Sequence, residues 1–123
     1  MEWNIDFHTD FYPEFTELPE DVQLELLAKV VLLETFGPSL KRPHVDTLNG
    51  SAHSNMKELR FNAVDGVWRV AFAFDPLRRG ILLVAGDKSG SSEKRFYQQL
   101  IQKADSRFND HLVKLAEQKR DDS

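Results

Sequence analysis

The chain has 123 residues, of which 41% are hydrophobic and 11% aromatic, and this composition is ordinary for a single soluble globular domain. It contains no cysteine, which excludes a disulfide framework, thiolate catalysis and a zinc site with cysteine ligands. No apolar run approaches the roughly 18 residues of a membrane span, and the acidic N-terminus lacks the basic and apolar regions of a signal peptide. We therefore expect a cytoplasmic protein with no membrane contact.

The net charge of −4 is unevenly distributed along the chain. Residues 1–40 carry nine acidic side chains and one basic, residues 41–95 carry ten basic and six acidic, and residues 96–123 carry five of each. An acidic shell around a basic patch weakens long-range attraction to bulk nucleic acid. Any contact with RNA therefore requires that the RNA is already held in a docked, preassembled target. The alternative is that these charged side chains only form a solvated surface.

The N-terminal third predicts a strand, two helices and a loop. Residues 3–7 alternate in the manner of a short strand, and Thr9 or Asp10 can cap the helical turn that follows. Residues 19–36 predict a longer helix, with proline and acids in its first turn, a Gly-Pro stop and a core-facing row of Val and Leu. Residues 37–55 predict a long loop, a kind of segment that is often functional.

Three β-type segments follow, and each places a cationic side chain among apolar neighbours. They cover residues 56–61, 67–74 and 80–88, with an Asp-Gly turn signal before the second and Lys88 at the end of the third. Because a domain rarely places Arg and Lys in this way without an anion to bind, the segments predict an anion-binding surface.

Alternation in the second segment assigns its side chains to two sheet faces. The bulky set, which predicts a core face, consists of Trp68, Val70, Phe72 and Phe74. Arg69 projects from the opposite face, where its neighbours in the strand are Val67, Ala71 and Ala73, so we expect Arg69 to lie on a floor of small residues. Glu58 and Arg60 share one face of the first segment, so antiparallel pairing can bring Arg60 and Arg69 onto one surface.

The C-terminal part predicts a final helix that begins at Ser91 or Ser92. Its apolar residues repeat at helical spacing, and the charged tail of residues 117–123 predicts fraying, so we expect a single domain over residues 1–116. The order of elements predicts an α+β fold: a mostly antiparallel sheet of about four strands, with helices packed on one face and the other face open.

These motifs resemble the RelE/HigB-type toxins of bacterial toxin–antitoxin pairs, especially the phage-derived Gp49-like branch. The resemblance covers roughly residues 3–112, and it rests on the stretches at residues 42–50, 57–61, 66–75, 86–90 and 93–97. It implies a RelE-like fold and cleavage of mRNA at the ribosomal A site without a metal or other cofactor. The implied partners are the ribosome, mRNA and a helix-turn-helix antitoxin that inhibits the toxin.

The resemblance also implies roles for individual residues. Arg69 matches the arginine that contacts the scissile phosphate, Lys88 lies near a basic position at the end of the last strand, and Tyr97 matches an aromatic residue that stacks on a base or transfers a proton. The chain departs from the pattern in the first hairpin strand. Some members carry two lysines at alternating positions there, whereas this chain has Met56 and Glu58.

Metal-free RNA cleavage needs a base for the ribose 2′-OH, an acid for the leaving oxygen, and cations for the charge of the transition state. Arginine suits the last role, because it stays charged and binds phosphate with two donors. Arg69 either contacts phosphate or forms a salt bridge with Glu58 or Asp87. Arg60 likewise either contacts phosphate or forms a salt bridge with Glu58. For the general base, three alternatives remain: Glu58 takes the place of the lysines, the loop histidines contribute, or the rate is lower.

The remaining candidates for RNA contact are Lys57, Arg95, Arg42, His44 and His53, and each has solvation as its alternative. His44 and His53 do not predict a metal site, because no third and fourth ligands follow in a compact pattern. The leading hypothesis is an mRNA endonuclease toxin. The alternative is a non-catalytic module that binds RNA, the ribosome or another protein through the same basic sheet face.

Overall fold

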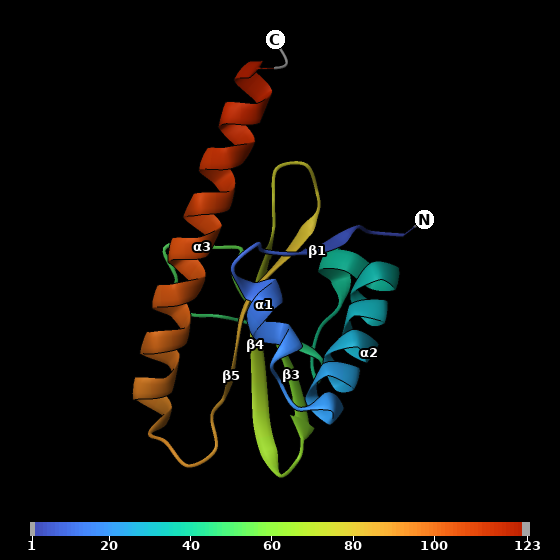
Figure 1. Ribbon diagram of the computed structural model, residues 1–123, viewed down its shortest axis with the longest axis vertical. Coiled ribbons are helices and arrows are strands. Elements are labelled where there is room, and N and C mark those ends of the chain that lie inside the picture. The colour runs from blue at the N-terminus through green and yellow to red at the C-terminus, as the bar shows by residue number, and fades with distance from the viewer. Residues whose placement is uncertain (1, 122–123) are drawn as a thin grey trace.

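A five-stranded sheet in the order β1-β5-β4-β3-β2 forms the centre of the molecule (Figure 1). The computed structural model describes residues 2–121. The elements are β1 (Ile5–Phe7), α1 (Phe11–Thr16), α2 (Glu20–Phe36), the 3-10 helix η1 (Gly37–Ser39), β2 (Val45–Thr47), β3 (Lys57–Ala63), β4 (Gly66–Phe74), β5 (Gly80–Asp87) and α3 (Glu93–Asp121). Among the described strands, only β1 pairs in parallel, with β5. The prediction of a mostly antiparallel α+β fold is confirmed. The fifth strand is β2, whose three residues are too few to show alternation.

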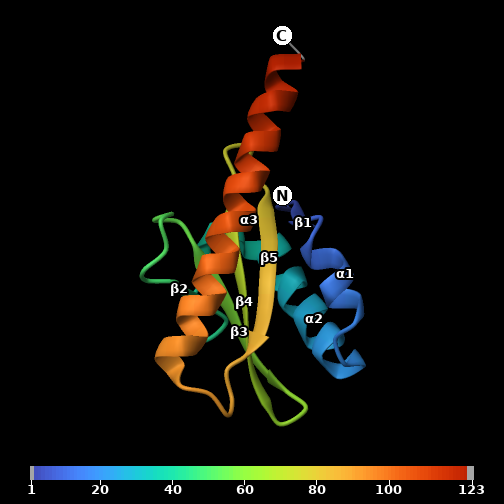
Figure 2. The ribbon, with the colours of Figure 1, turned by 60° about the vertical axis from the view of Figure 1, so that its left-hand side comes forward.

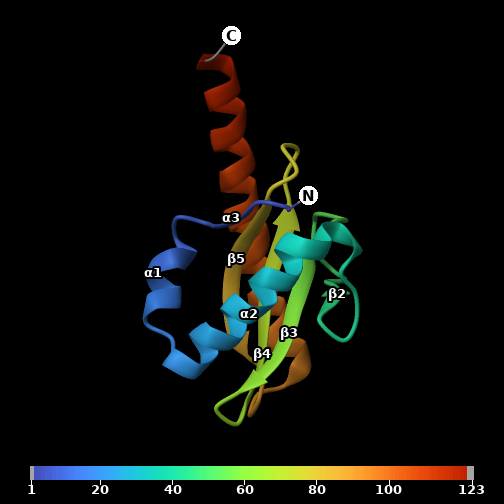
Figure 3. The same cartoon turned by 90° about the vertical axis from the view of Figure 1, so that its right-hand side faces the viewer.

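The helices cover both faces of the sheet, whereas the sequence predicts helices on one face only (Figures 2 and 3). The α1 and α2 side holds one core cluster, which includes Leu26 and the predicted core-facing Val70 and Phe72. The α3 side holds a second cluster, in which Leu100, Ala104 and Phe108 of α3 pack on small and aliphatic residues of β4 and β5. The predicted open face is therefore closed, because its small side chains let a helix approach.

A two-residue turn between β3 and β4 sets the register of the hairpin. Val64 and Asp65 have φ values of 50° and 57°, which fit the primed turns that match the twist of paired strands. Gly66 follows the turn as the first residue of β4, and a Cβ there would lie 2.8 Å from side-chain atoms of Asp87 and Trp68. This turn pairs Arg60 directly with Arg69.

Polar contacts fasten α3 to the rest of the domain along its length. Arg107 forms an ion pair with Glu14 of α1 and donates to a β5 carbonyl at 2.8 Å, and His111 lies 2.8 Å from Asp75 after β4. The helix continues through Asp121, so residues 117–121 of the predicted frayed tail are helical, whereas residues 122–123 lie outside the described residues. Among residues 2–121, no helix combines the length and apolar character that crossing a membrane requires.

Candidate active site

Charged side chains of the β3–β4 hairpin meet on the sheet face that α3 covers. Glu58 and Arg60 are two positions apart in β3 and project to the same side, and Arg60 lies directly opposite Arg69. Two cations in such positions need a counter-charge. Oε2 of Glu58 lies 3.1 Å from Nη1 of Arg60, and its Oε1 lies 3.7 Å from Nε of Arg69. The salt bridges considered as an alternative to phosphate binding are thus present in this structure, with Glu58 rather than Asp87.

Tyr97 reaches this cluster from the N-terminal part of α3. Its hydroxyl donates to Oε1 of Glu58 at 2.8 Å and accepts from Nε of Arg69 at 3.3 Å. Gly86 in β5 permits the approach, because a Cβ there would lie 2.8 Å from the ring of Phe96. Burial, and then the hydrogen bond to Glu58, raise the pKa of Tyr97 above its usual value. The phenol is therefore protonated at neutral pH, and it holds the carboxylate rather than acting as a base.

Arg69 is enclosed in this structure. The predicted floor of small residues exists, but α3 lies over it, and only 5% of Arg69 is exposed. Its Nη1 also donates to the carbonyl of Trp68 at 2.9 Å. The side chain of Arg60 keeps 23% of its surface exposed. Arg60 is therefore the cation of the pair that solvent reaches more readily.

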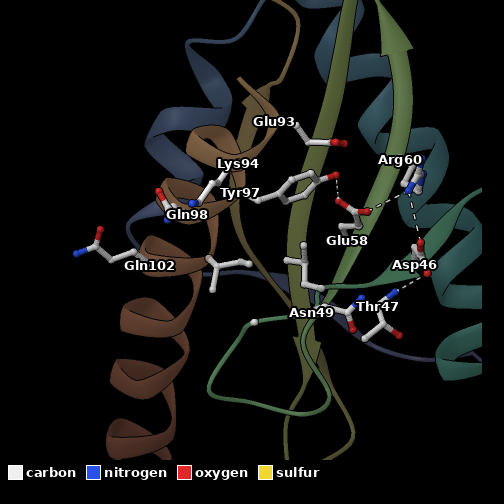
Figure 4. Close-up of a pocket in the computed structure, with 13 residues that line it drawn as sticks. Asp46, Thr47, Asn49, Glu58, Arg60, Glu93, Lys94, Tyr97, Gln98 and Gln102 are labelled. Carbon is white, nitrogen blue, oxygen red and sulfur yellow. Dashed lines mark hydrogen bonds and ion pairs between the residues drawn. The ribbon is translucent and has the colours of Figure 1, made fainter. Parts of the chain in front are cut away.

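A groove of about 860 Å³ runs between α3 and the β2–β3 edge, and Glu58, Arg60 and Tyr97 of the cluster form part of its wall, whereas Arg69 lies behind them. Figure 4 shows Tyr97 pointing from α3 toward Glu58, with Arg60 and Asp46 beyond. The lining residues are Asp46, Thr47, Leu48, Asn49, Gly50, Glu58, Arg60, Glu93, Lys94, Tyr97, Gln98, Ile101 and Gln102. The groove thus combines charged groups, amides and an aromatic ring along one channel.

Asp46 extends the charged network to the edge of the sheet. Its Oδ2 lies 3.6 Å from Nη1 of Arg60 and 2.6 Å from Nη2 of Arg42. The hydrogen bond from Arg42 lowers the pKa of Asp46 below its usual value. Sequence reasoning did not select Asp46, nor Lys94, Asn49, Gln98 and Gln102. A signal for Asp46 was its place in the 42–50 motif.

Lys88 lies next to the cluster but is not one of the groove-lining residues. It follows the end of β5, as the sequence predicts. Its Nζ lies 5.7 Å from the centroid of the Tyr97 ring and 3.1 Å from Oε1 of Glu93. The ammonium group is therefore close to the aromatic ring of the cluster.

Of the other predicted RNA contacts, only Arg42 is connected to the cluster, through Asp46. Lys57 projects from the opposite sheet face to Glu58, and its Nζ lies 3.3 Å from the carbonyl of Pro38. The remaining contacts are Lys29 with His44 at 3.0 Å, His53 with Asn109 at 2.8 Å, and Arg42 with Asp46, while Arg95 is exposed in the first turn of α3. Within residues 2–121, no cluster of three or more His, Asp or Glu side chains is arranged to hold a metal ion.

The fold has counterparts among solved structures of toxins. A mutant of the E. coli toxin RelE in the free state matches with a TM-score of 0.63 at 16% identity, over 87% of this chain and 98% of that one. RelE in the archaeal RelE-RelB complex from Pyrococcus horikoshii OT3 matches with a TM-score of 0.54 at 17% identity, over 74% of this chain and 100% of that one. The fold is therefore that of the RelE class.

Sequence comparison places the chain within this class more closely. Two Mycobacterium tuberculosis (strain ATCC 25618 / H37Rv) proteins match it: "Putative toxin HigB2", 42% identical over 95 residues, and "Putative toxin HigB3", 44% identical over 99 residues. The matches cover 76% and 80% of this chain, but 47% of HigB2 and 84% of HigB3, so the chain spans about half the length of HigB2. The model of the phage derived protein Gp49-like family matches residues 13–109. The chain belongs to this family, of RelE/HigB type, and the resemblance inferred from its motifs is confirmed.

Proposed function

We propose that this protein is the toxin of a toxin–antitoxin pair, that it cleaves mRNA on the ribosome without a metal, and that a helix-turn-helix antitoxin inhibits it. The observation that carries the proposal is the network of contacts that joins Glu58, Arg60, Arg69 and Tyr97 beside one groove, which Glu58, Arg60 and Tyr97 line. The names of the two relatives support a toxin, and the RelE-RelB complex supports an antitoxin partner.

We assign the groups that the reaction requires to the cluster and to Lys88 beside it. Glu58 is the carboxylate at its centre, and it takes the proton of the ribose 2′-OH as that oxygen attacks phosphorus. Arg60 and Arg69 bind the non-bridging oxygens and stabilise the additional negative charge of the transition state. The 5′-oxygen leaves with a proton from Lys88, and the product carries a 2′,3′-cyclic phosphate.

Substrate entry requires that Tyr97 releases its two partners. The hydroxyl now occupies one oxygen of Glu58 and the Nε of Arg69, and Glu58 is only 3% exposed. A nucleobase of the RNA that stacks on the Tyr97 ring compensates for the two lost hydrogen bonds. Stacking also draws the hydroxyl away from Glu58 and Arg69. The groove volume of about 860 Å³ lies within the range of sites that hold small organic ligands.

A requirement for the ribosome follows from the charge distribution. The protein has a net charge of −4, and its basic side chains are concentrated in residues 41–95. A local positive patch on an acidic protein gives weak capture of free RNA, since the long-range field is unfavourable. Presentation of mRNA in a fixed position on the ribosome removes this disadvantage.

A second candidate function is non-catalytic binding of RNA or the ribosome through the same groove. The observation that favours it is the enclosure of Arg69 beneath α3, together with the pairing of both arginines to Glu58. If Tyr97 does not move, Arg60 and Lys94 remain available in the groove to bind RNA. Glu58, the proposed general base, then stays inaccessible to the RNA. This reading predicts association with RNA without new RNA ends.

A defined translation reaction tests the proposal against this alternative. Purified protein is added with and without ribosomes, and new mRNA ends and their terminal phosphates are mapped. We expect ribosome-dependent cuts with cyclic or 3′-phosphate ends, reduced at least about 100-fold in Arg69→Ala. Arg60→Ala is a second variant, because Arg69 is buried and its loss can disturb folding. Lys119→Ala, an exposed cation at the far end of α3, is the control. Intact mRNA in an active translation reaction contradicts the proposal.

A further inference from the structure

Helix α2 is apolar on two sides, although it packs on the sheet with only one. Its inner side is buried through Val22, Leu26 and Leu33. A helix that is hydrophobic all round is normally covered all round, whereas an ordinary surface helix carries polar residues on its outer face. The outer face of α2 therefore has the composition of a contact surface.

The outer apolar residues are Leu24, Leu27 and Val31, which we call the α2 stripe. They occur at positions i, i+3 and i+7, the spacing that places side chains in one row along a helix. Their exposed fractions are 57%, 42% and 58%. Figure 3 shows α2 as the outermost layer on its side of the sheet, with no other described element lying over it. A row of large apolar side chains left in water is typical of a protein-binding site.

Acidic residues surround the α2 stripe. Glu20, Asp21 and Glu25 are exposed on the same helix, and none of the ion pairs found among residues 2–121 uses them. They belong to the segment of residues 1–40, which carries nine acids and one base. The one base of this segment, Lys29, contacts His44 with its Nζ instead, so α2 keeps a net negative charge around the stripe.

This charge selects among the molecules that could cover the stripe. A second copy of the chain would bring the same acids together across a twofold interface, which is unfavourable. RNA and an anionic membrane surface would be repelled for the same reason. A protein helix with an apolar row flanked by Lys and Arg satisfies both the exposed side chains and the charge.

We propose that the α2 stripe is the docking site of the antitoxin, through an amphipathic helix with basic flanks. The identity of the partner rests on the proposed function, whereas the chemistry of the partner surface rests on α2 alone. The stripe and the groove lie on opposite sides of the sheet, since α2 and α3 cover opposite faces. A helix bound to the stripe therefore leaves Glu58, Arg60 and Tyr97 uncovered.

The test measures binding and cleavage separately. The probe is the protein encoded by the reading frame next to that of this chain, expressed alone and titrated by calorimetry into the full chain. The variant is Leu24→Ser/Leu27→Ser/Val31→Ser, and the matched control is Val113→Ser on α3, where the residue is 56% exposed against 58% for Val31. All four positions are exposed, so the variants are expected to fold, which circular dichroism and thermal unfolding verify.

We expect the triple variant to bind at least about 100-fold more weakly, and the control within about threefold of the wild type. Affinity for the wild type also falls between about 0.05 M and about 0.5 M salt, because the acids contribute to binding. Unchanged binding of the triple variant, no binding of the wild type, or a homodimer that the triple variant abolishes overturns the proposal. Absence of RNA cleavage by the wild type contradicts the proposed function instead, and it leaves the binding result to stand by itself.

Discussion

Replacement of Glu58 by glutamine tests the central group of the candidate site with the smallest change in shape. The glutamine keeps one oxygen acceptor for the Tyr97 hydroxyl, but it removes the negative charge that both arginines face at 3.1 and 3.7 Å. An amide also cannot take a proton from the ribose 2′-OH. Glu58→Gln is therefore expected to reduce stability and cleavage together, for two different reasons.

The loss of stability can be worked from burial. Arg69 and Glu58 have side-chain exposures of 6% and 4%, and breaking a buried pair costs about 3–5 kcal/mol. Arg60 is 23% exposed, so its pair adds only a few tenths of a kcal/mol after solvent screening. Because the amide oxygen preserves part of the hydrogen bonding, we expect a loss of about 3 kcal/mol in the free energy of unfolding. In a domain of this size that lowers Tm by about 10 °C.

The loss of cleavage is expected to be at least about 100-fold, the lower range for a general base. Urea unfolding and single-turnover mapping of mRNA ends on ribosomes are measured on the same preparations, at a temperature where the variant is folded. Glu17→Gln is the control, because Glu17 is exposed at the C-terminal end of α1 and is not one of the groove-lining residues. Cleavage by Glu58→Gln at the wild-type rate would refute its role as the base.

Three further substitutions probe the site and the contacts that hold α3 on the sheet. Tyr97→Phe keeps a stacking ring but loses a hydroxyl that hydrogen-bonds two charged groups, so urea unfolding is expected to show a loss of about 1–2 kcal/mol, with more cleavage retained than in Tyr97→Ala. Burial acts to raise the pKa of Asp75, but hydrogen bonds from His111 and a backbone amide hold it below its usual value. Its stabilisation is complete above the unfolded pKa of about 4 and is lost as pH falls through the lower folded pKa, so Asp75→Asn should flatten the decline of stability between about pH 4 and pH 2. Gly86→Val places carbon atoms against Phe96, where a Cβ alone would lie at 2.8 Å, and a loss of about 1–3 kcal/mol in urea unfolding is expected, with weaker cleavage.

The arginine pair was predictable because it depends on local rules. Alternation assigns Arg60 and Arg69 to faces of their own strands, and a short turn between those strands determines which residues lie opposite. The sequence signal was Asp-Gly, while the turn residues in the structure are Val64 and Asp65. This difference of one position did not change the face to which either arginine points.

The enclosure of Arg69 was not predictable from these rules. A helix with one apolar row can pack on either face of a sheet, and its choice depends on the combined shape of both surfaces. Ala71 and Ala73 were interpreted as an open floor for Arg69, whereas they receive α3. The position of Tyr97 beside Glu58 follows from that packing, so only the family resemblance connected Tyr97 to the site before the structure did.

The two proposed sites require ligands of opposite charge, and the sheet keeps them apart. On the α3 side, five cations outnumber the three carboxylates that lie among them, so an anion is the natural ligand there; the cations are Arg42, Arg60, Arg69, Lys88 and Lys94, and the carboxylates are Asp46, Glu58 and Glu93. On the α2 side, unpaired acids surround an exposed apolar stripe, so a basic helix is the natural ligand. A single acidic segment cannot satisfy both surfaces. An antitoxin that binds α2 would therefore inhibit by its bulk, by keeping the groove away from ribosome-bound mRNA, rather than by imitating RNA in the groove.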